Sequence, residues 1–267
     1  MNHVVMFSGG VGSWAAAKRV AAEHGTDNLT LLFTDTKIED ADTYRFLHAA
    51  AANVGGKFVQ IAEGRTPWEV FRDVRFLGNS RVDPCSLHLK RTLADRWLDG
   101  HHDPADTTVY IGIDWSEIHR FERLRERKLP WIYHAPMCYP PYLTKDEMHE
   151  WAEREGLRKQ RLYTLGMPHA NCGGGCIKMG IGGFARLYYA DPCRFAEWER
   201  NEEQLRARLG NVSILRDRTN GQSKPMTLRA LRERLEGGGT VDMFDIGGCG
   251  CMVDEGVAPR EPDHDQK

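Results

Sequence analysis

Short apolar runs separated by longer amphipathic segments make up the first half of the chain. Runs of five or six mostly apolar or β-branched residues predict buried strands, and the alanine-rich and charged segments between them predict helices. The expected strands are 3–7, 29–34, 57–61, 108–113 and 131–136. Strands and helices that alternate at this spacing predict parallel pairing with right-handed crossovers. We therefore expect an α/β fold with a twisted, mainly parallel sheet and helices on both faces.

The second half of the chain has a different pattern, in which charged helical segments and glycine-flanked cysteines replace the apolar runs. Helices rich in Arg and Glu are expected over 192–209 and 227–235, with short extended pieces at 213–218 and 243–246. This pattern predicts a small helical, cysteine-containing appendage. We expect an α/β domain over 1–165, the appendage over 166–257 and a disordered tail over 258–267.

Charge and composition narrow the class of protein. The formal net charge of −2 over 267 residues argues against an indiscriminate nucleic-acid binder, although the Arg-rich helices offer a local surface for a phosphate backbone. No apolar run approaches the roughly 20 residues of a membrane span, and no signal peptide is evident. We therefore expect a cytoplasmic protein that contacts no membrane, and its seven cysteines to be reduced thiols or metal ligands.

A glycine-rich turn between the first strand and the first helix is the strongest candidate for chemistry. It reads Ser8-Gly9-Gly10-Val11-Gly12-Ser13. Backbone N–H groups at a helix start have no partner within the helix, and glycines let an anion approach the main chain. The two serines add hydroxyl donors. The plain alternative is an ordinary turn between a strand and a helix, but this composition favours a phosphate site.

This turn resembles the Ser-Gly-Gly-x-x-Ser pyrophosphate loop of the adenine nucleotide α-hydrolase (PP-loop) superfamily, whose members bind ATP and act at its α-phosphate. The common form has Asp where this chain has Gly12, and some sulfonucleotide reductases also lack that Asp. The segment around Asp35-Thr36 is similar to one that lies against the adenosine in phosphoadenylyl-sulfate reductases. The resemblance thus implies nucleotide contacts from the whole 8–13 loop, Asp35 and Thr36. Asp35 could instead only cap a turn.

Two further segments extend the resemblance to catalytic candidates. Gly112, Glu117 and Arg120 match the family's fourth strand end, where Arg120 could clamp a phosphate; the plain alternative is a surface ion pair between Glu117 and Arg120. The run from Cys85 to Lys90 resembles the Cys-x-x-x-Leu-Lys segment of reductase-like ATP pyrophosphatases that install sulfur in DNA. One helix face cannot carry both Cys85 and Lys90 unless the cysteine precedes the helix. Cys85 is then a nucleophile or a ligand, or else an inert buried thiol.

Two glycine-flanked cysteine pairs predict a metal centre. Cys172 and Cys176 are separated by three glycines, and Cys249 and Cys251 by one. Four thiolates suit Zn²⁺ or a [4Fe–4S] cluster, and the family context favours iron, although the family spacing has two intervening residues. Without glycine neighbours, Cys138 and Cys193 are expected to be structural. His149 is expected on a helix surface, and His169 and Asn171 are weaker candidates for substrate contact.

Together these features indicate an enzyme of sulfur chemistry. The resemblance implies that ATP with Mg²⁺ is split at the α-phosphate and that a DNA or tRNA acceptor is activated. It also implies that a protein such as a cysteine desulfurase donates the sulfur. The sequence leaves open whether the protein forms a homo-oligomer. One alternative is a reductase of adenylyl sulfate or its 3′-phosphorylated form, although that family's Glu-Cys-Gly-Ile-His tail is absent from this sequence. A non-catalytic nucleotide- or cluster-sensing module is the third possibility.

Overall fold

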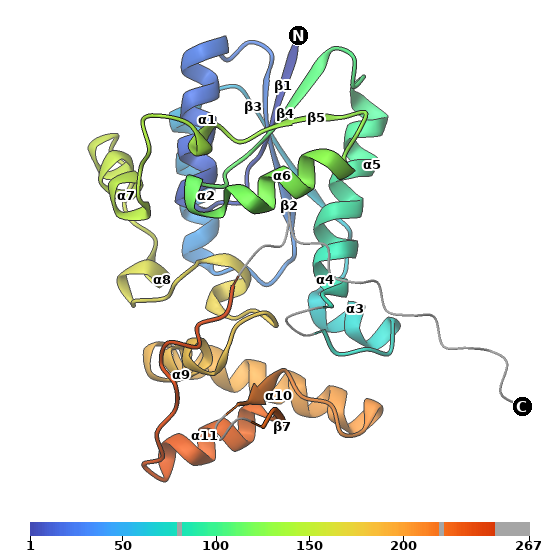
Figure 1. The fold of residues 1–267 in the computed structure, drawn as a ribbon, viewed down its shortest axis with the longest axis vertical. Helices are drawn as coiled ribbons and strands as arrows, with labels where there is room; N and C mark the ends of the chain where they lie inside the picture. Colours follow the sequence, from blue (N-terminus) through green and yellow to red (C-terminus); the bar gives the residue numbers. More distant parts are fainter. Residues whose placement is uncertain (79–81, 219–221, 249–267) are drawn as a thin grey trace, which may run out of the picture.

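A parallel sheet lies at the centre of the molecule. The computed structural model describes residues 1–78, 82–218 and 222–248. Within them, five parallel strands pair in the order β3-β2-β1-β4-β5. The strands are β1 (Asn2–Met6), β2 (Leu29–Asp35), β3 (Lys57–Ala62), β4 (Thr107–Ile111) and β5 (Ile132–His134). The expected α/β fold is confirmed (Figure 1).

The three inner strands are buried along almost their whole length, as expected for strands covered on both faces. Val5 on β1 lies between Leu31 of β2 and Tyr110 of β4 in the register of the sheet. Edge strand β3 alternates between more and less exposed positions. The near-continuous apolar runs in the sequence follow from this double burial.

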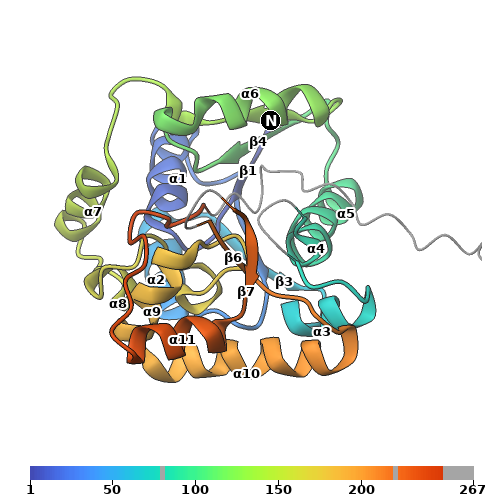
Figure 2. The ribbon, with the colours of Figure 1, turned by 60° about the horizontal axis from the view of Figure 1, so that its bottom comes forward.

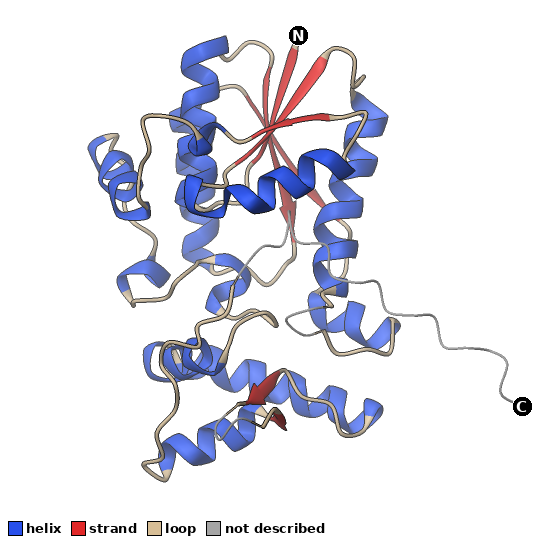
Figure 3. Cartoon of the chain, viewed as in Figure 1, coloured by secondary structure: helices blue, strands red, loops and turns tan. Residues whose placement is uncertain are grey.

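Helices cover both faces of the sheet (Figure 3). Trp14, Phe46 and Met148 belong to the core on one face, which α1 (Val11–His24), α2 (Ala41–Val54) and α7 (Lys145–Arg154) cover. Leu98 and Phe121 belong to the core on the other face, under α5 (Thr92–His101) and α6 (Ile118–Arg127). Short helices complete this part: α3 (Pro67–Asp73), α4 (Pro84–Ser86) and α8 (Arg161–Thr164).

The appendage packs beyond the carboxyl ends of the strands (Figure 2). It contains α9 (Ile181–Ala190), α10 (Pro192–Leu209), α11 (Leu228–Glu236) and an antiparallel pair of short strands, β6 (Leu215–Asp217) and β7 (Lys224–Met226). Its core includes Phe184 and Trp198, and also Trp68 and Phe71 from α3. The appendage therefore shares a hydrophobic core with the α/β part.

Several local expectations need correction. His149 is buried rather than on the surface, because its ring packs against Tyr163 with ring centroids 4.5 Å apart. Cys193 is exposed on the first turn of α10, whereas Cys138 is buried as expected. The extended piece expected over 243–246 begins with a turn at residues 243 and 244, and an isolated antiparallel bridge between Gly247 and Met179 follows it. Across the described ranges, no helix combines the length and apolar character needed to cross a membrane.

Candidate functional site

A pocket of about 610 Å³ opens at the carboxyl ends of the inner strands. Strand order reverses between β1 and β4, since the chain passes from β1 to β2 on one side and returns to β4 on the other. Parallel α/β sheets bind ligands at this reversal, and the volume is typical of small-molecule sites. Apolar side chains from all three strands line the inner part: Met6, Phe7, Leu32, Phe33, Ile111 and Ile113.

The glycine-rich turn forms the floor of this pocket. Helix α1 begins after Gly10, and in the described structure no side chain caps it and no acidic residue occupies its first turn. The first-turn amides of α1 are therefore available to an anion. Ser8 and Ser13 line the pocket with their hydroxyls 3.4 Å apart, and the Ser13 hydroxyl donates to the Gly10 carbonyl at 2.8 Å. The result is a cradle of backbone N–H donors flanked by two serine hydroxyls.

Gly9 and Val11 support this turn from behind. Gly9 has a φ of +79°, and its α-carbon faces Thr43 and Leu47 of α2. Its carbonyl accepts a hydrogen bond of 3.0 Å from the buried amide of Gln160. Val11 is 1% exposed and packs in the core. Only Ser8, Gly10, Gly12 and Ser13 of the predicted loop residues line the pocket.

The end of β4 approaches the same turn at backbone distance. A Cβ placed on Gly112 would lie 2.5 Å from the Ser13 nitrogen, and one placed on Gly12 would lie 2.8 Å from the Gly112 carbonyl oxygen. Both positions therefore require glycine. Gly112, which the resemblance placed at the end of this strand, therefore packs against the glycine-rich turn.

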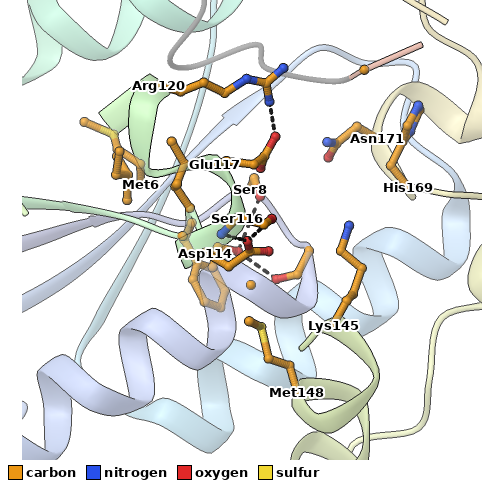
Figure 4. A pocket seen from close by; sticks show the side chains of 18 of the residues that line it. Met6, Ser8, Asp114, Ser116, Glu117, Arg120, Lys145, Met148, His169 and Asn171 are labelled. Carbon is orange, nitrogen blue, oxygen red and sulfur yellow. Dashed lines mark hydrogen bonds and ion pairs between the residues drawn. The ribbon is translucent and has the colours of Figure 1, made fainter. Parts of the chain in front are cut away.

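Charged side chains after β4 line the outer pocket (Figure 4). Glu117 and Arg120 form an ion pair, and both residues line the pocket. The ion pair expected as the plain alternative is therefore compatible with a position beside a ligand. Asp114 also lines the pocket, and its carboxylate accepts hydrogen bonds from the Ser116 backbone at 2.9 Å and hydroxyl at 2.5 Å.

The opposite wall comes from the later part of the chain. His169 and Asn171, both weaker sequence candidates, line it, and Lys145 points its ammonium group toward the pocket (Figure 4). Sequence reasoning missed Lys145 and Tyr163. The available signal for Lys145 was its place directly after Thr144, where a capping box opens α7 with both reciprocal hydrogen bonds to Glu147.

Asp35 and Thr36 are buried beside the pocket and are not among the described residues that line it. The Asp35 carboxylate accepts hydrogen bonds from the Tyr44 hydroxyl at 2.6 Å and the Gln60 amide at 3.0 Å. The Thr36 hydroxyl donates to Glu39 at 3.0 Å. The structure thus places both residues in the hydrogen-bonded support of the strand end, where Thr34 takes the lining position.

A second, small cavity brings three cysteines and a lysine together. Cys85, Cys172 and Cys176 line it with Lys90, and its volume is about 10 Å³, close to that of one water. Lys90 also lines the nucleotide-sized pocket. Cys85 lies in α4, directly before the π-helical turn Leu87–Arg91, and the wider π turn lets Cys85 and Lys90 line the same cavity although they are five residues apart. The expected obstacle to a joint role is therefore removed by the π turn.

The lysine and the cysteine loop are tied to one buried carboxylate. Glu39 lies 3.8 Å from the Lys90 ammonium and accepts a hydrogen bond of 2.5 Å from the Cys172 backbone nitrogen. Both charged side chains are almost fully buried. A second buried carboxylate, Asp83, pairs with Arg91 at 3.1 Å and Lys178 at 3.3 Å. Local sequence patterns do not reveal this role of Glu39, because its partners Lys90 and Cys172 lie far along the chain.

The glycines of the Cys172–Cys176 loop have a packing reason. Cys172 and the next two residues have φ of +55°, +65° and +85°. A Cβ on Gly173 would lie 2.4 Å from the Arg194 guanidinium, and one on Gly175 would lie 2.4 Å from the Trp198 ring. The predicted ligands Cys249 and Cys251 lie outside the described residues. Within the described ranges, no group of three or more His, Cys, Asp or Glu side chains is arranged to hold a metal ion.

The Arg-rich helices carry carboxylates at matching positions. Arg229 and Arg232 pair with Glu199 across α10 and α11, and Arg194 pairs with Glu197 within α10. Arg234 pairs with Asp217 on β6. These ion pairs offset much of the positive charge that the sequence offered for a phosphate backbone.

Comparisons with known proteins leave the family open. No family model and no curated protein matches the chain. The solved structure of NMN synthetase from Francisella tularensis shares 14% sequence identity with this chain, with a TM-score of 0.42. The match covers 59% of this chain and 62% of that chain, so it spans less than two thirds of the length of NMN synthetase. NH3-dependent NAD synthetase from Campylobacter jejuni subsp. jejuni shares 12% identity over 78% of this chain and 83% of that chain, with a TM-score of 0.40. Both scores lie below 0.5, and neither likeness assigns a family or an activity.

Proposed function

We propose that this chain is an ATP pyrophosphatase-type enzyme of sulfur chemistry, which splits ATP at the α-phosphate to activate a nucleic-acid acceptor. One observation carries the proposal. Lys90 lines both the pocket above the Ser8–Ser13 turn and the cavity of Cys85, Cys172 and Cys176. The proposed nucleotide site and a set of thiols therefore meet at the buried Lys90, which would bring an adenylated acceptor close to a sulfur-carrying cysteine.

The residues divide the ATP molecule among them. The apolar strand ends would take the adenine, and the uncapped start of α1 with Ser8 and Ser13 would take the phosphates. Arg120 and Lys90 would offset the charge that develops as the bond between the α- and β-phosphates breaks. Mg²⁺ would arrive with ATP as part of the substrate.

The chemistry then proceeds in two displacements. An acceptor oxygen attacks the α-phosphorus and pyrophosphate leaves, which gives an adenylated acceptor. The terminal sulfur of a Cys85 persulfide, loaded by a donor such as a cysteine desulfurase, bonds to the activated atom, and AMP leaves with the former acceptor oxygen. A second thiolate, from Cys172 or Cys176, attacks the Cys85 sulfur, forms a disulfide and leaves the terminal sulfur on the acceptor. The acceptor is DNA or tRNA.

A [4Fe–4S] cluster or Zn²⁺ remains part of the proposal only through Cys172 and Cys176. Their two thiols are half of the predicted donor set, and Cys249 and Cys251 lie outside the described residues. The described side chains by themselves do not fit a metal centre. We therefore derive no step through a cluster or a metal ion.

The cysteine cavity also supports the second candidate, a reductase of adenylyl sulfate or its 3′-phosphorylated form. In that reaction a thiolate would attack the sulfur of the bound sulfonucleotide, and AMP or its 3′-phosphate would leave. This route needs no cleavage of ATP. Sulfite release from adenylyl sulfate after thiol reduction, with ATP left intact, would favour the reductase.

A binding experiment tests the nucleotide site itself. Gly9→Val places a side chain at a φ of +79° within the phosphate turn, against Thr43 and Leu47. Gly25→Val is the matched control, because Gly25 has a φ of +76° and open space around it. Calorimetry with ATP should show lost affinity in Gly9→Val and unchanged affinity in Gly25→Val. Equal affinity in both variants would remove the turn from the site.

A further inference from the structure

The segment Asp242–Gly248, here called the C-terminal strap, lies on the first turn of α9. The Asp245 carbonyl accepts hydrogen bonds from the backbone nitrogens of Gly182 at 2.9 Å and Gly183 at 3.4 Å. The Asp245 carboxylate accepts one from the Ile181 backbone nitrogen at 3.4 Å. The Ile246 carbonyl accepts from Gly180 at 3.0 Å. These donors are the backbone amides that a helix start leaves without partners. A segment about sixty residues further along the chain therefore caps α9 with its own backbone.

Glycines on α9 make this close approach possible. A Cβ on Gly180 would lie 2.3 Å from the Asp245 carbonyl oxygen, and one on Gly182 would lie 2.6 Å from the Asp242 carbonyl oxygen. Both contacts are to backbone, which cannot turn aside as a flexible side chain can. The glycines thus form a groove that fits a main chain and little else.

From this groove the strap continues into the nucleotide pocket. Gly247 pairs with Met179 in an antiparallel bridge and has a φ of +71°. Gly247 and Gly248 both line the pocket above the phosphate turn. A Cβ on Gly248 would lie 3.4 Å from the Arg120 guanidinium on α6. The strap therefore joins α9 of the appendage to the α6 side of the pocket.

We infer that the docked strap is a wall of the nucleotide site, and that Gly182 and Asp245 are positioning residues for it. The inference rests on the proposed function, because it requires that the pocket binds ATP. A nucleotide that contacts Gly247 and Gly248 binds more tightly when the strap is docked. By linkage, the bound nucleotide then stabilises docking by the same factor. Neither residue touches the nucleotide in this account, since both act through the strap.

Two readouts test the inference on the full chain. The first is hydrogen exchange of the Ile181, Gly182 and Gly183 amides, and the second is equilibrium binding of a nonhydrolysable ATP analogue. Gly182→Val should speed exchange at α9 and weaken analogue binding roughly tenfold, within the usual range of coupling between sites. Gly100→Val is the control, because Gly100 also lies within a helix and has nothing within 4 Å of an added Cβ. The control should match the wild type in both readouts.

Asp245→Ala gives a milder second variant, since it removes only the carboxylate cap of Ile181 and should shift both readouts in the same direction. In the wild type, the analogue should slow exchange of the α9 amides. Unchanged analogue affinity in a folded variant whose α9 amides exchange freely would overturn the inference. Protected α9 amides in Gly182→Val would also overturn it, since the groove would then not hold the strap. If the wild-type protein binds no analogue, the proposed function is refuted instead. Hydrogen exchange of the α9 amides in the absence of nucleotide would still show whether the strap is docked.

Discussion

Gly12 and Gly112 meet backbone to backbone, with the position of a Gly12 Cβ only 2.8 Å from the Gly112 carbonyl oxygen. This contact accounts for the departure from the common PP-loop form, which has Asp at the position of Gly12. In this chain the end of β4 occupies the space that an Asp side chain needs. Backbone therefore fills the space beside position 12, and this packing is compatible with glycine there but not with Asp.

Introducing Asp at position 12 should lower both the stability of the protein and its affinity for ATP. We expect Gly12→Asp and Gly12→Ala to lower the free energy of unfolding by about 1–3 kcal/mol, as overpacking does, and to weaken ATP binding. Gly100→Ala is the control, because Gly100 lies within α5, away from the pocket lining, and a Cβ there meets nothing within 4 Å. Urea unfolding and calorimetry measure both effects. Tighter ATP binding in Gly12→Asp would contradict the packing account.

His149 should make stability depend on pH. Burial, followed by the charges of Lys159 and Lys145, lowers the pKa of His149 to about 4. The unfolded chain therefore binds a proton at this residue between pH 6.5 and about 4 while the folded chain does not, so stability falls as pH drops through that window. Between pH 7 and pH 5 the loss from this residue should be about 2 kcal/mol.

His149→Phe should remove this part of the slope and keep the ring contact with Tyr163. His119→Gln is the control, because His119 is exposed on α6. Urea unfolding at pH 7 and pH 5 compares the three proteins. Equal slopes in His149→Phe and the wild type would show that His149 is not the residue that loses its proton on folding.

Lys90 and Glu39 should behave as a coupled buried pair. Lys90→Met removes the buried ammonium group beside the Glu39 carboxylate and should cost about 3–5 kcal/mol of stability. The double variant Lys90→Met/Glu39→Gln should recover much of that loss, because the remaining side chain is neutral. ATP turnover should be lost in both. A double variant as unstable as the single one, or one that still turns over ATP, would separate Lys90 from the role proposed here.

The sheet could be read from the sequence because its evidence is local. Apolar runs predict the strands, and Thr144 with Glu147 marks the start of α7. Helix α9 was missed, because Gly182 and Gly183 lower its intrinsic helix propensity and its first turn is stabilised by the distant strap. Strand β7 was missed because its three residues, Lys-Pro-Met, form no apolar run and include a proline, which strands disfavour.

The site was only partly readable for the same reason. The Ser8–Ser13 turn is contiguous in sequence, so its glycines and serines alone predict a candidate anion site. Glu39, by contrast, joins Lys90 and Cys172 through contacts across 51 and 133 positions, and no local pattern encodes them. The π turn that aligns Cys85 with Lys90 has no known local signature in this run of residues. The reading of the Cys172–Cys176 glycines as ligand turns overlooked Arg194 and Trp198, which pack against them.

The central claim is that ATP is cut between its α- and β-phosphates. The most direct measurement is product analysis of ATP labelled at the α-phosphate, incubated with the purified chain, Mg²⁺, a nucleic-acid acceptor and a persulfide donor. The account predicts that label appears in AMP, with pyrophosphate formed in equal amount, and that Lys90→Met forms neither. Labelled ADP with orthophosphate, or intact ATP while adenylyl sulfate yields sulfite, would contradict it.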